Sequence, residues 1–254
     1  MKKTVFIIAF FLATFSYAQS TTMLAMLLED GKEESYLKLE ENWQKVNEAL
    51  VAVGYITQWS VWKRTPREGD DGWAQYFVMI RRNAEQDKMD QNNWEQVAKK
   101  VFKGKSTKAI NRMLSNEGIV KEMRSRTYKL VSSTGWRGLE WEIGDKSSFH
   151  YMTQKNEDFV AYETAVWKPI AQQQILDGYI KYWGLSELIG SNDVTKALES
   201  TATHIAFNFP TKKENSTGLE LAEDFLSKKA WSALLESREM LPAEELTLIY
   251  STFK

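Results

Sequence analysis

The sequence predicts an α+β protein in which one β-α-β-β-α-β unit occurs twice. Two observations support this prediction: one segment of the first half reappears in the second, and the expected strands and helices follow the same order in both halves. The repeated segment runs from Trp43 to Trp59, and its counterpart runs from Trp167 to Trp183, 124 residues later, with a glycine and a Tyr-Ile pair in register. A repeat of this length is a doubled domain rather than a short structural repeat.

The first half is anchored by a long amphipathic helix. Its apolar residues Leu39, Trp43, Val46 and Leu50 recur at spacings of three and four, and Gly54 stands where a C-terminal cap belongs. Apolar and aromatic runs predict the flanking strands. The elements expected in this half are strand 22–29, helix 33–53, strands 55–62 and 73–80, helix 89–102 and strand 128–132. The pattern over 103–127 leaves further helical turns open.

The second half repeats this order. Its expected elements are strand 149–153, helix 158–177, strands 179–185 and 203–209, helix 219–240 and strand 246–253. The copies differ, because Gln174 and Asp177 stand where the first copy has Leu50 and Val53. The later strands are offset by 128 rather than 124 residues, which predicts four inserted residues around 191–200. We therefore expect a first unit at 19–133, a connection at 134–147 and a second unit at 148–254.

The N-terminus is typical of a secretory signal peptide at 1–18. Lys2 and Lys3 precede an apolar run from Val5 to Phe15, and Ala18 ends a segment of small residues suited to cleavage. The alternative is a membrane anchor, but a spanning helix needs roughly 20 apolar residues. The absence of cysteine also removes the residue that bacterial lipoproteins acylate. The sequence thus predicts a periplasmic or secreted protein without a membrane anchor after cleavage.

Composition excludes several classes of function. A chain without cysteine has no disulfides, thiolate metal sites or cysteine nucleophile. The 33 basic and 34 acidic residues form no long block of either sign, so nothing indicates a nucleic-acid partner. Signature motifs of hydrolases, metalloproteases and dinucleotide-binding proteins are missing. We expect no cofactor and no metal, and the oligomeric state stays open, with a monomer possible.

The order of elements, together with Trp43, Gly54, Trp59 and their counterparts, resembles the ferredoxin-like superfamily of dimeric α+β barrels. That group includes the antibiotic-biosynthesis monooxygenases and the NIPSNAP proteins. Its members usually pair two single-domain subunits whose sheets face each other and close a barrel. The resemblance implies that this chain, which carries both copies, forms such a barrel within one molecule.

The aromatic residues suggest where a ligand binds. The chain has ten tryptophans and ten tyrosines, whose ordinary role is to fill the cores of such units. The alternative is a pocket that combines rings with a few amide or hydroxyl groups. Because side chains alternate along a strand, Trp59 and Gln58 face opposite sides of the sheet, but the pattern does not say which side lines the barrel. The candidate ligand-binding residues are Trp59, Trp183, Gln58, Tyr182, Asn208 and His150.

The two histidines, His150 and His204, fall on strands that are expected to be antiparallel neighbours. We expect about four residues, or roughly 13 Å, between them, which is too far for a shared metal. His204 is the candidate general base, because Ala206 and Asn208 on the same face leave room beside it. The alternative is a hydrogen-bonded structural histidine.

Three functions remain in competition after these exclusions. The first is the binding of a small, partly apolar or aromatic ligand in a pocket between the two units. The second, which the resemblance implies, is a cofactor-independent monooxygenase in which Trp59 or Trp183 shapes the cavity and His204 assists proton removal. The third is a structural or interaction protein without a ligand.

Overall fold

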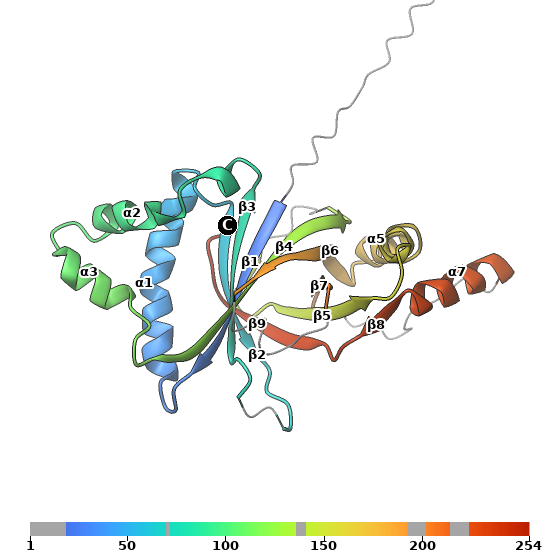
Figure 1. Cartoon of the computed structure of the whole chain (residues 1–254), viewed down its shortest axis with the longest axis horizontal. Helices are drawn as coiled ribbons and strands as arrows, with labels where there is room; N and C mark the ends of the chain where they lie inside the picture. Colours follow the sequence, from blue (N-terminus) through green and yellow to red (C-terminus); the bar gives the residue numbers. More distant parts are fainter. Residues whose placement is uncertain (1–18, 70–71, 136–140, 193–201, 214–223, 254) are drawn as a thin grey trace, which may run out of the picture.

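A computed structural model of the chain describes residues 19–69, 72–135, 141–192, 202–213 and 224–253 (Figure 1). The predicted signal peptide and nearly all of the predicted insertion at 191–200 lie outside these residues. Among the helices that the structure describes, none has the length and apolar character needed to cross a bilayer.

Eight strands close into one antiparallel barrel, which confirms the predicted α+β class. The first half contributes β1 (Gln19–Leu28), β2 (Gln58–Arg64), β3 (Tyr76–Asn83) and β4 (Val120–Ser133). The second half contributes β5 (Lys146–Gln154), β6 (Ile180–Ser191), β7 (His204–Pro210) and β9 (Glu244–Ser251). A short strand, β8 (Arg238–Met240), adds to β5 beyond the barrel.

Both halves arrange their four barrel strands in the same way. The first half has the order β4-β1-β3-β2, and the second half has the order β9-β5-β7-β6. In each half the first and third strands are the central antiparallel neighbours. The β2–β9 and β4–β6 pairs join the halves and complete the ring.

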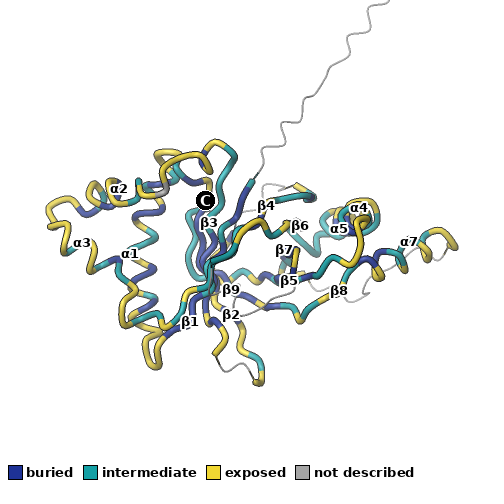
Figure 2. The backbone as a smooth tube through the Cα atoms, in the orientation of Figure 1, coloured by how far each residue is buried: buried dark blue, intermediate teal, exposed yellow. Residues whose placement is uncertain are grey.

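Helices cover the barrel from two opposite sides (Figure 1). One side carries the helices of the first half, which are α1 (Glu33–Ala52), α2 (Trp94–Val101) and α3 (Thr107–Leu114), with the 3-10 turns η1 (Gln86–Lys88) and η2 (Gln91–Asn93). The other side carries α4 (Phe159–Tyr162), the π-helical segment η3 (Glu163–Trp167), α5 (Lys168–Leu176) and α7 (Phe225–Glu236). Most of α7 is exposed or half-buried, and it extends away from the barrel (Figure 2).

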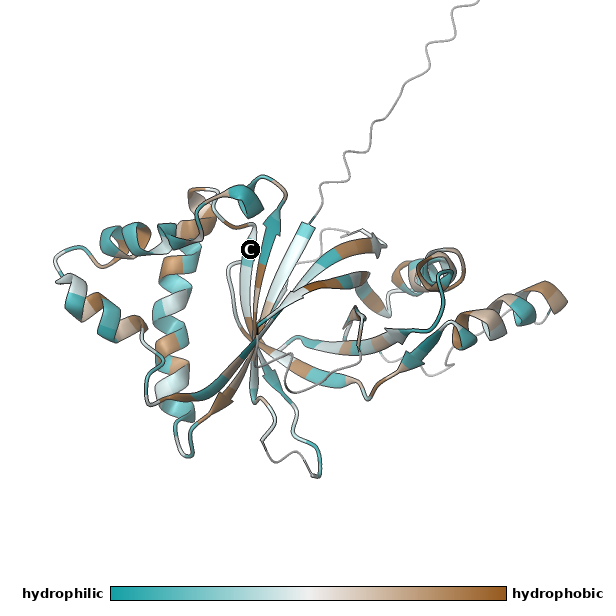
Figure 3. Cartoon of the chain, viewed as in Figure 1, coloured by the Kyte–Doolittle hydropathy of each residue, from teal (hydrophilic) through white to brown (hydrophobic). Residues whose placement is uncertain are grey.

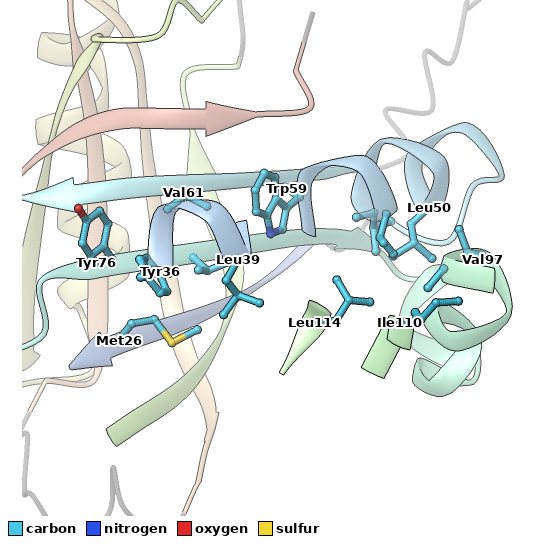
Figure 4. Packing of buried hydrophobic residues seen from close by; sticks show 14 of the residues in the cluster. Met26, Tyr36, Leu39, Leu50, Trp59, Val61, Tyr76, Val97, Ile110 and Leu114 are labelled. Atoms are coloured by element: carbon cyan, nitrogen blue, oxygen red, sulfur yellow. The ribbon is translucent and has the colours of Figure 1, made fainter. Parts of the chain in front are cut away.

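The long first helix forms as the sequence predicts. It spans Glu33–Ala52, and Gly54 follows with a φ of +80°, a left-handed conformation that glycine adopts without strain. Its apolar face packs on the first-half sheet, where Leu39, Leu50 and Trp59 share one hydrophobic cluster with α2 and α3 (Figure 4). Figure 3 shows this pattern as alternating hydrophobic and hydrophilic bands along α1.

Three predicted elements differ in detail from the structure. The predicted helix 158–177 forms as a helical run from Phe159 to Leu176, but its middle is a π segment that precedes Pro169; proline has no amide hydrogen and its ring crowds the carbonyl four residues earlier. The described part of the predicted helix 219–240 ends at Glu236, and Arg238–Met240 pairs with β5 as a strand. β4 is far longer than 128–132, because it pairs with both β1 and β6.

Three apolar layers result. The barrel interior holds one cluster, the α1 side holds a second, and the α4–α5 side holds a smaller third cluster around Met152, Phe159 and Trp183. The consecutive buried residues of β2 reflect this arrangement, since one face of the strand meets the barrel interior and the other meets the helices.

Candidate ligand pocket

A pocket of about 230 Å³ lies in the layer between α1 and the outer face of the first-half sheet. The sheet forms its floor, α1 forms one wall, and the segment from Met89 to Trp94 covers its end. Figure 4 shows Trp59 in this layer, directed from β2 toward α1. The lining residues are Leu24, Met26, Glu40, Trp43, Asn47, Leu50, Tyr55, Ile56, Trp59, Val78, Ile80, Arg82, Met89, Asp90, Asn93 and Trp94.

Aromatic rings dominate the walls. The rings of Trp43 on α1 and Trp94 on α2 lie 5.2 Å apart at an angle of 59°, so they join the two helices above the pocket. Such pairs contribute about 0.5–1.5 kcal/mol beyond the area they bury. Trp59 is buried, and its ring stacks on that of Tyr250 with 6.5 Å between the ring centroids and 27° between the ring planes.

Glu40 is the most unusual residue of the lining. It is 3% exposed in the middle of α1, one turn before Trp43. Desolvation raises the pKa of its carboxyl to about 7, while the neighbouring Tyr36 hydroxyl acts in the opposite direction. A buried carboxyl of this kind changes protonation near neutral pH, which suits it to proton transfer or to the recognition of a donor group.

The pocket becomes more exposed toward the end formed by Met89 and Asp90. Both of these residues are exposed, whereas Glu40 and Asn47 are buried. The Asp90 carboxylate accepts a hydrogen bond of 2.9 Å from the Asn92 amide and so caps η2. We therefore place the mouth of the pocket at the connection between β3 and α2.

Arg82 lies near this mouth, close to the end of β3. Burial lowers the pKa of its guanidinium, and the charge of Asp87 partly offsets that effect. Its Nη1 donates a long hydrogen bond of 3.4 Å to Thr22 Oγ1, and its buried Nε has no hydrogen-bond partner within the part of the chain that the structure describes.

The sequence analysis predicts a pocket between the two units, whereas this cavity lies within the first unit. The interface between the units is the barrel interior, where large rings pack on one another. The Trp62 ring lies 5.4 Å from Trp141, 6.4 Å from Phe149 and 5.7 Å from Phe209. Rings of both halves therefore pack against one another in the space where the ligand was expected.

Of the predicted site residues, Trp59 lines the pocket. Gln58 and Tyr182 lie on the barrel side instead. Gln58 Oε1 accepts a hydrogen bond of 3.4 Å from Arg81, and the Tyr182 ring packs 5.7 Å from that of Phe209. The other predicted residues, Trp183, Asn208, His150 and His204, all lie on the helix-facing side of the second unit.

Trp183 is the counterpart of Trp59, but it is fully buried in the third cluster with Phe159 and Leu185. Asn208 is its neighbour across the β6–β7 pair. His150 Nε2 lies 3.0 Å from Ser148 Oγ, and burial together with the charge of Arg238 lowers its pKa.

His204 lies in the layer between the sheet and α4 of the second unit. Its ring packs 4.8 Å from that of Phe159, its Nδ1 lies 2.9 Å from Thr203 Oγ1, and burial lowers its pKa. Met152 is its register partner on β5, so His150 is displaced by two residues rather than the expected four. His204 does not line the pocket of the first unit.

Comparison with known proteins identifies the fold. No family model and no curated protein matches the chain. A putative monooxygenase from Fusobacterium nucleatum subsp. nucleatum superimposes with a TM-score of 0.56 at 11% identity, covering 94% of this chain and 96% of that chain. A putative monooxygenase from Lactobacillus acidophilus gives a TM-score of 0.54 at 7% identity, covering 92% and 95%. The chain has the dimeric α+β barrel fold.

In this dimeric α+β barrel, the polar residues of the pocket are not among the site residues predicted from the sequence. Glu40 and Asn47 flank the apolar stripe of α1, and both are buried. The available signal was their position, because Glu40 comes four residues after Tyr36 and three before Trp43 on one helical face. Arg82 and Asp90 gave no such signal, since they enter the pocket through tertiary contacts only.

Proposed function

We propose that the protein binds a small, mainly apolar molecule in the pocket of the first unit. The observation that carries this proposal is the pocket itself, a cavity of about 230 Å³ lined by three tryptophans and a few polar groups. Pockets of this composition are typical of small-molecule sites. An engineered cavity of about 150 Å³ holds benzene, so this cavity suits a ligand of one or two fused rings.

The test is a thermal-shift and fluorescence titration with one-ring and two-ring compounds. A ligand at 100 times its Kd stabilises the folded state by about 2.7 kcal/mol, and it also changes the emission of tryptophans that it contacts. Val78→Phe fills the cavity from the sheet side and should weaken binding at least tenfold. Ile189→Phe, an exposed site on β6, is the matched control. Equal binding by both variants would contradict the proposal.

A second candidate is a cofactor-independent, monooxygenase-like enzyme. Two features support it: the structural neighbours include proteins described as putative monooxygenases, and Glu40 offers a base with a pKa of about 7 beside an aromatic cavity. Glu40 here takes the role that the sequence suggested for His204. Oxygen uptake with quinol-like compounds should then be lost in Glu40→Gln, and the absence of uptake with any compound that binds would reject this candidate.

We further infer that the two units are copies of one ancestral module, at 19–133 and 148–254, and that the protein is exported after removal of 1–18. The repeated sequence and the equal strand orders support the first inference. The signal-like N-terminus supports the second, and cleavage after Ala18 would leave β1 intact because that strand begins at Gln19. Mass spectrometry of the protein from culture fractions tests the export and the cleavage site.

A further inference from the structure

We propose that the pocket selects a ligand with a positively charged nitrogen, an aryl-substituted ammonium compound, which it holds between the Glu40 carboxylate and the surrounding tryptophans. This inference rests on the proposed ligand-binding function and adds the chemical class of the ligand. It depends on the placement of one carboxyl group, on the arrangement of the rings and on the charge balance of the lining.

Glu40 is buried without an ion pair to any described residue. Burial of a carboxylate costs several kcal/mol unless a cation or several hydrogen bonds compensate it. Among the described residues, no lysine, arginine or histidine lies within ion-pair distance of Glu40, and its one notable polar neighbour is the Tyr36 hydroxyl. The acid therefore has room for a cationic partner on the side that faces the cavity.

Several of the lining residues are aromatic. Trp43, Trp59, Trp94 and Tyr55 all line the same cavity. The faces of aromatic rings attract ammonium groups, and cages of several rings are a known means of recognising alkylated ammonium ions. The tilted Trp43–Trp94 pair, with 59° between the ring planes, encloses the space from more than one direction.

The charged residues that line the pocket are mainly acidic. The lining contains the carboxyl groups of Glu40 and Asp90 but only one cation, Arg82. Arg82 lies near the mouth, where its charge interacts with Asp87 rather than with Glu40. Interior and mouth together thus favour a cation over an anion.

The pH dependence of binding follows from the groups that face Glu40. These are Tyr36 on the same helix, Tyr250 on β9, and Arg82 and Asp90 toward the mouth. Burial raises the pKa values of both tyrosines above 10, so neither changes charge near neutral pH. Because Glu40 has a pKa of about 7, affinity for an ammonium ion that stays protonated over this range should increase about tenfold between pH 6 and pH 8.

The experiment compares three probes that share one ring system: 1-naphthylmethylammonium, 1-naphthalenemethanol and 1-naphthoate. Calorimetric titration of the full-length mature protein at pH 8 should give a Kd for the ammonium compound at least tenfold lower than for the alcohol, with the carboxylate weakest. Equal affinity for the ammonium compound and the alcohol, or tighter binding of the carboxylate, would overturn the inference while leaving the proposed pocket function standing. If none of these probes and no other ring compound bound, both would fail.

Two variants assign the selectivity to Glu40. Glu40→Gln keeps the shape of the side chain and should reduce the ammonium-to-alcohol preference to about twofold or less, and it should also remove the change between pH 6 and pH 8. Glu48→Gln, an exposed site two turns further along α1, is the control and should retain both. A preference that persists in Glu40→Gln, while circular dichroism confirms folding, would contradict the role of this carboxyl.

Discussion

The two units differ in the partner of a buried glutamate on the helix of each unit. In the first unit, Glu40 is 3% exposed, lies one turn before Trp43 and faces the cavity, and among the described residues it forms no ion pair. In the second unit, Glu163 is 0% exposed, lies one turn before Trp167 and forms an ion pair with Arg238. The same region of one helix therefore carries a paired acid in one unit and an acid open to a ligand in the other.

The surrounding helices account for this difference. In the first unit, α1 is continuous, and α2 and α3 cover it from outside, which leaves the cavity beneath Trp43. In the second unit, the helix contains a π segment, and Ala171, which stands where the first unit has Asn47, packs in one cluster with Phe159 and Trp183. Two units with the same strand order can therefore differ in the packing of side chains between their helices and their sheet.

The largest expected effect comes from breaking the ion pair of the second unit. Glu163→Gln leaves the Arg238 guanidinium buried without its charge partner, which should lower the free energy of unfolding by about 3–5 kcal/mol. Urea denaturation monitored by circular dichroism measures this change. A loss below about 1 kcal/mol would mean that the ion pair with Arg238 stabilises the protein little, and that Glu163 and Glu40 do not differ in this respect.

Replacement of Glu40, the acid that forms no ion pair with a described residue, should instead raise the free energy of unfolding. The pKa of Glu40 is raised from 4.5 to about 7. The contribution of the protonated carboxyl to folding stability is therefore fully present below pH 4.5 and is lost as the pH rises through 7. Glu40→Gln should therefore be more stable than the natural protein by about 3 kcal/mol at pH 8 and nearly equal to it at pH 4.5. Denaturation at both pH values, with Glu48→Gln as control, measures the difference, and a destabilised Glu40→Gln at pH 8 would refute it.

A smaller effect separates the cavity from the packed layer. Val78 on β3 lines the cavity, whereas Ala206, 128 residues later on β7, belongs to the packed cluster around Trp183. Val78→Phe should cost less than about 1 kcal/mol in the absence of ligand, and Ala206→Phe should cost about 1–3 kcal/mol because its ring has no free space. Thermal melting of both variants tests the order, and equal losses would indicate that the cavity is not open in solution.

The smallest effect is expected at His204, which packs on Phe159 in the second unit. His204→Gln should leave the affinity for any ligand of the first unit unchanged within about twofold, because the residue lies outside that pocket. A titration with the best naphthyl probe measures this. A large loss of binding would move the site to the second unit.

Much of the fold could be predicted from the sequence because its signals are local. The apolar spacing of α1 and the glycine that follows its end are signals between neighbouring residues. The eight barrel strands follow the predicted order, while α3 and β8 are additional to the predicted elements. The class of each half therefore needed no tertiary information.

The site could be predicted only in part. Trp59 and Trp62 are both buried, on opposite faces of one strand, so the pattern could not show which of them meets the helices. The pairing of Glu163 with Arg238 links residues far apart in the sequence, and only the packed layer distinguishes that acid from Glu40. The charge partner of a polar residue on an apolar helix face depends on tertiary contacts.

The most direct test of the account is a crystal structure of the protein saturated with 1-naphthylmethylammonium. We predict density for one probe between α1 and β3, with its nitrogen beside the Glu40 carboxyl and its rings against Trp43 and Trp59. Density for the probe among Trp62 and Phe149 inside the barrel, or against Trp183 in the second unit, would contradict the account.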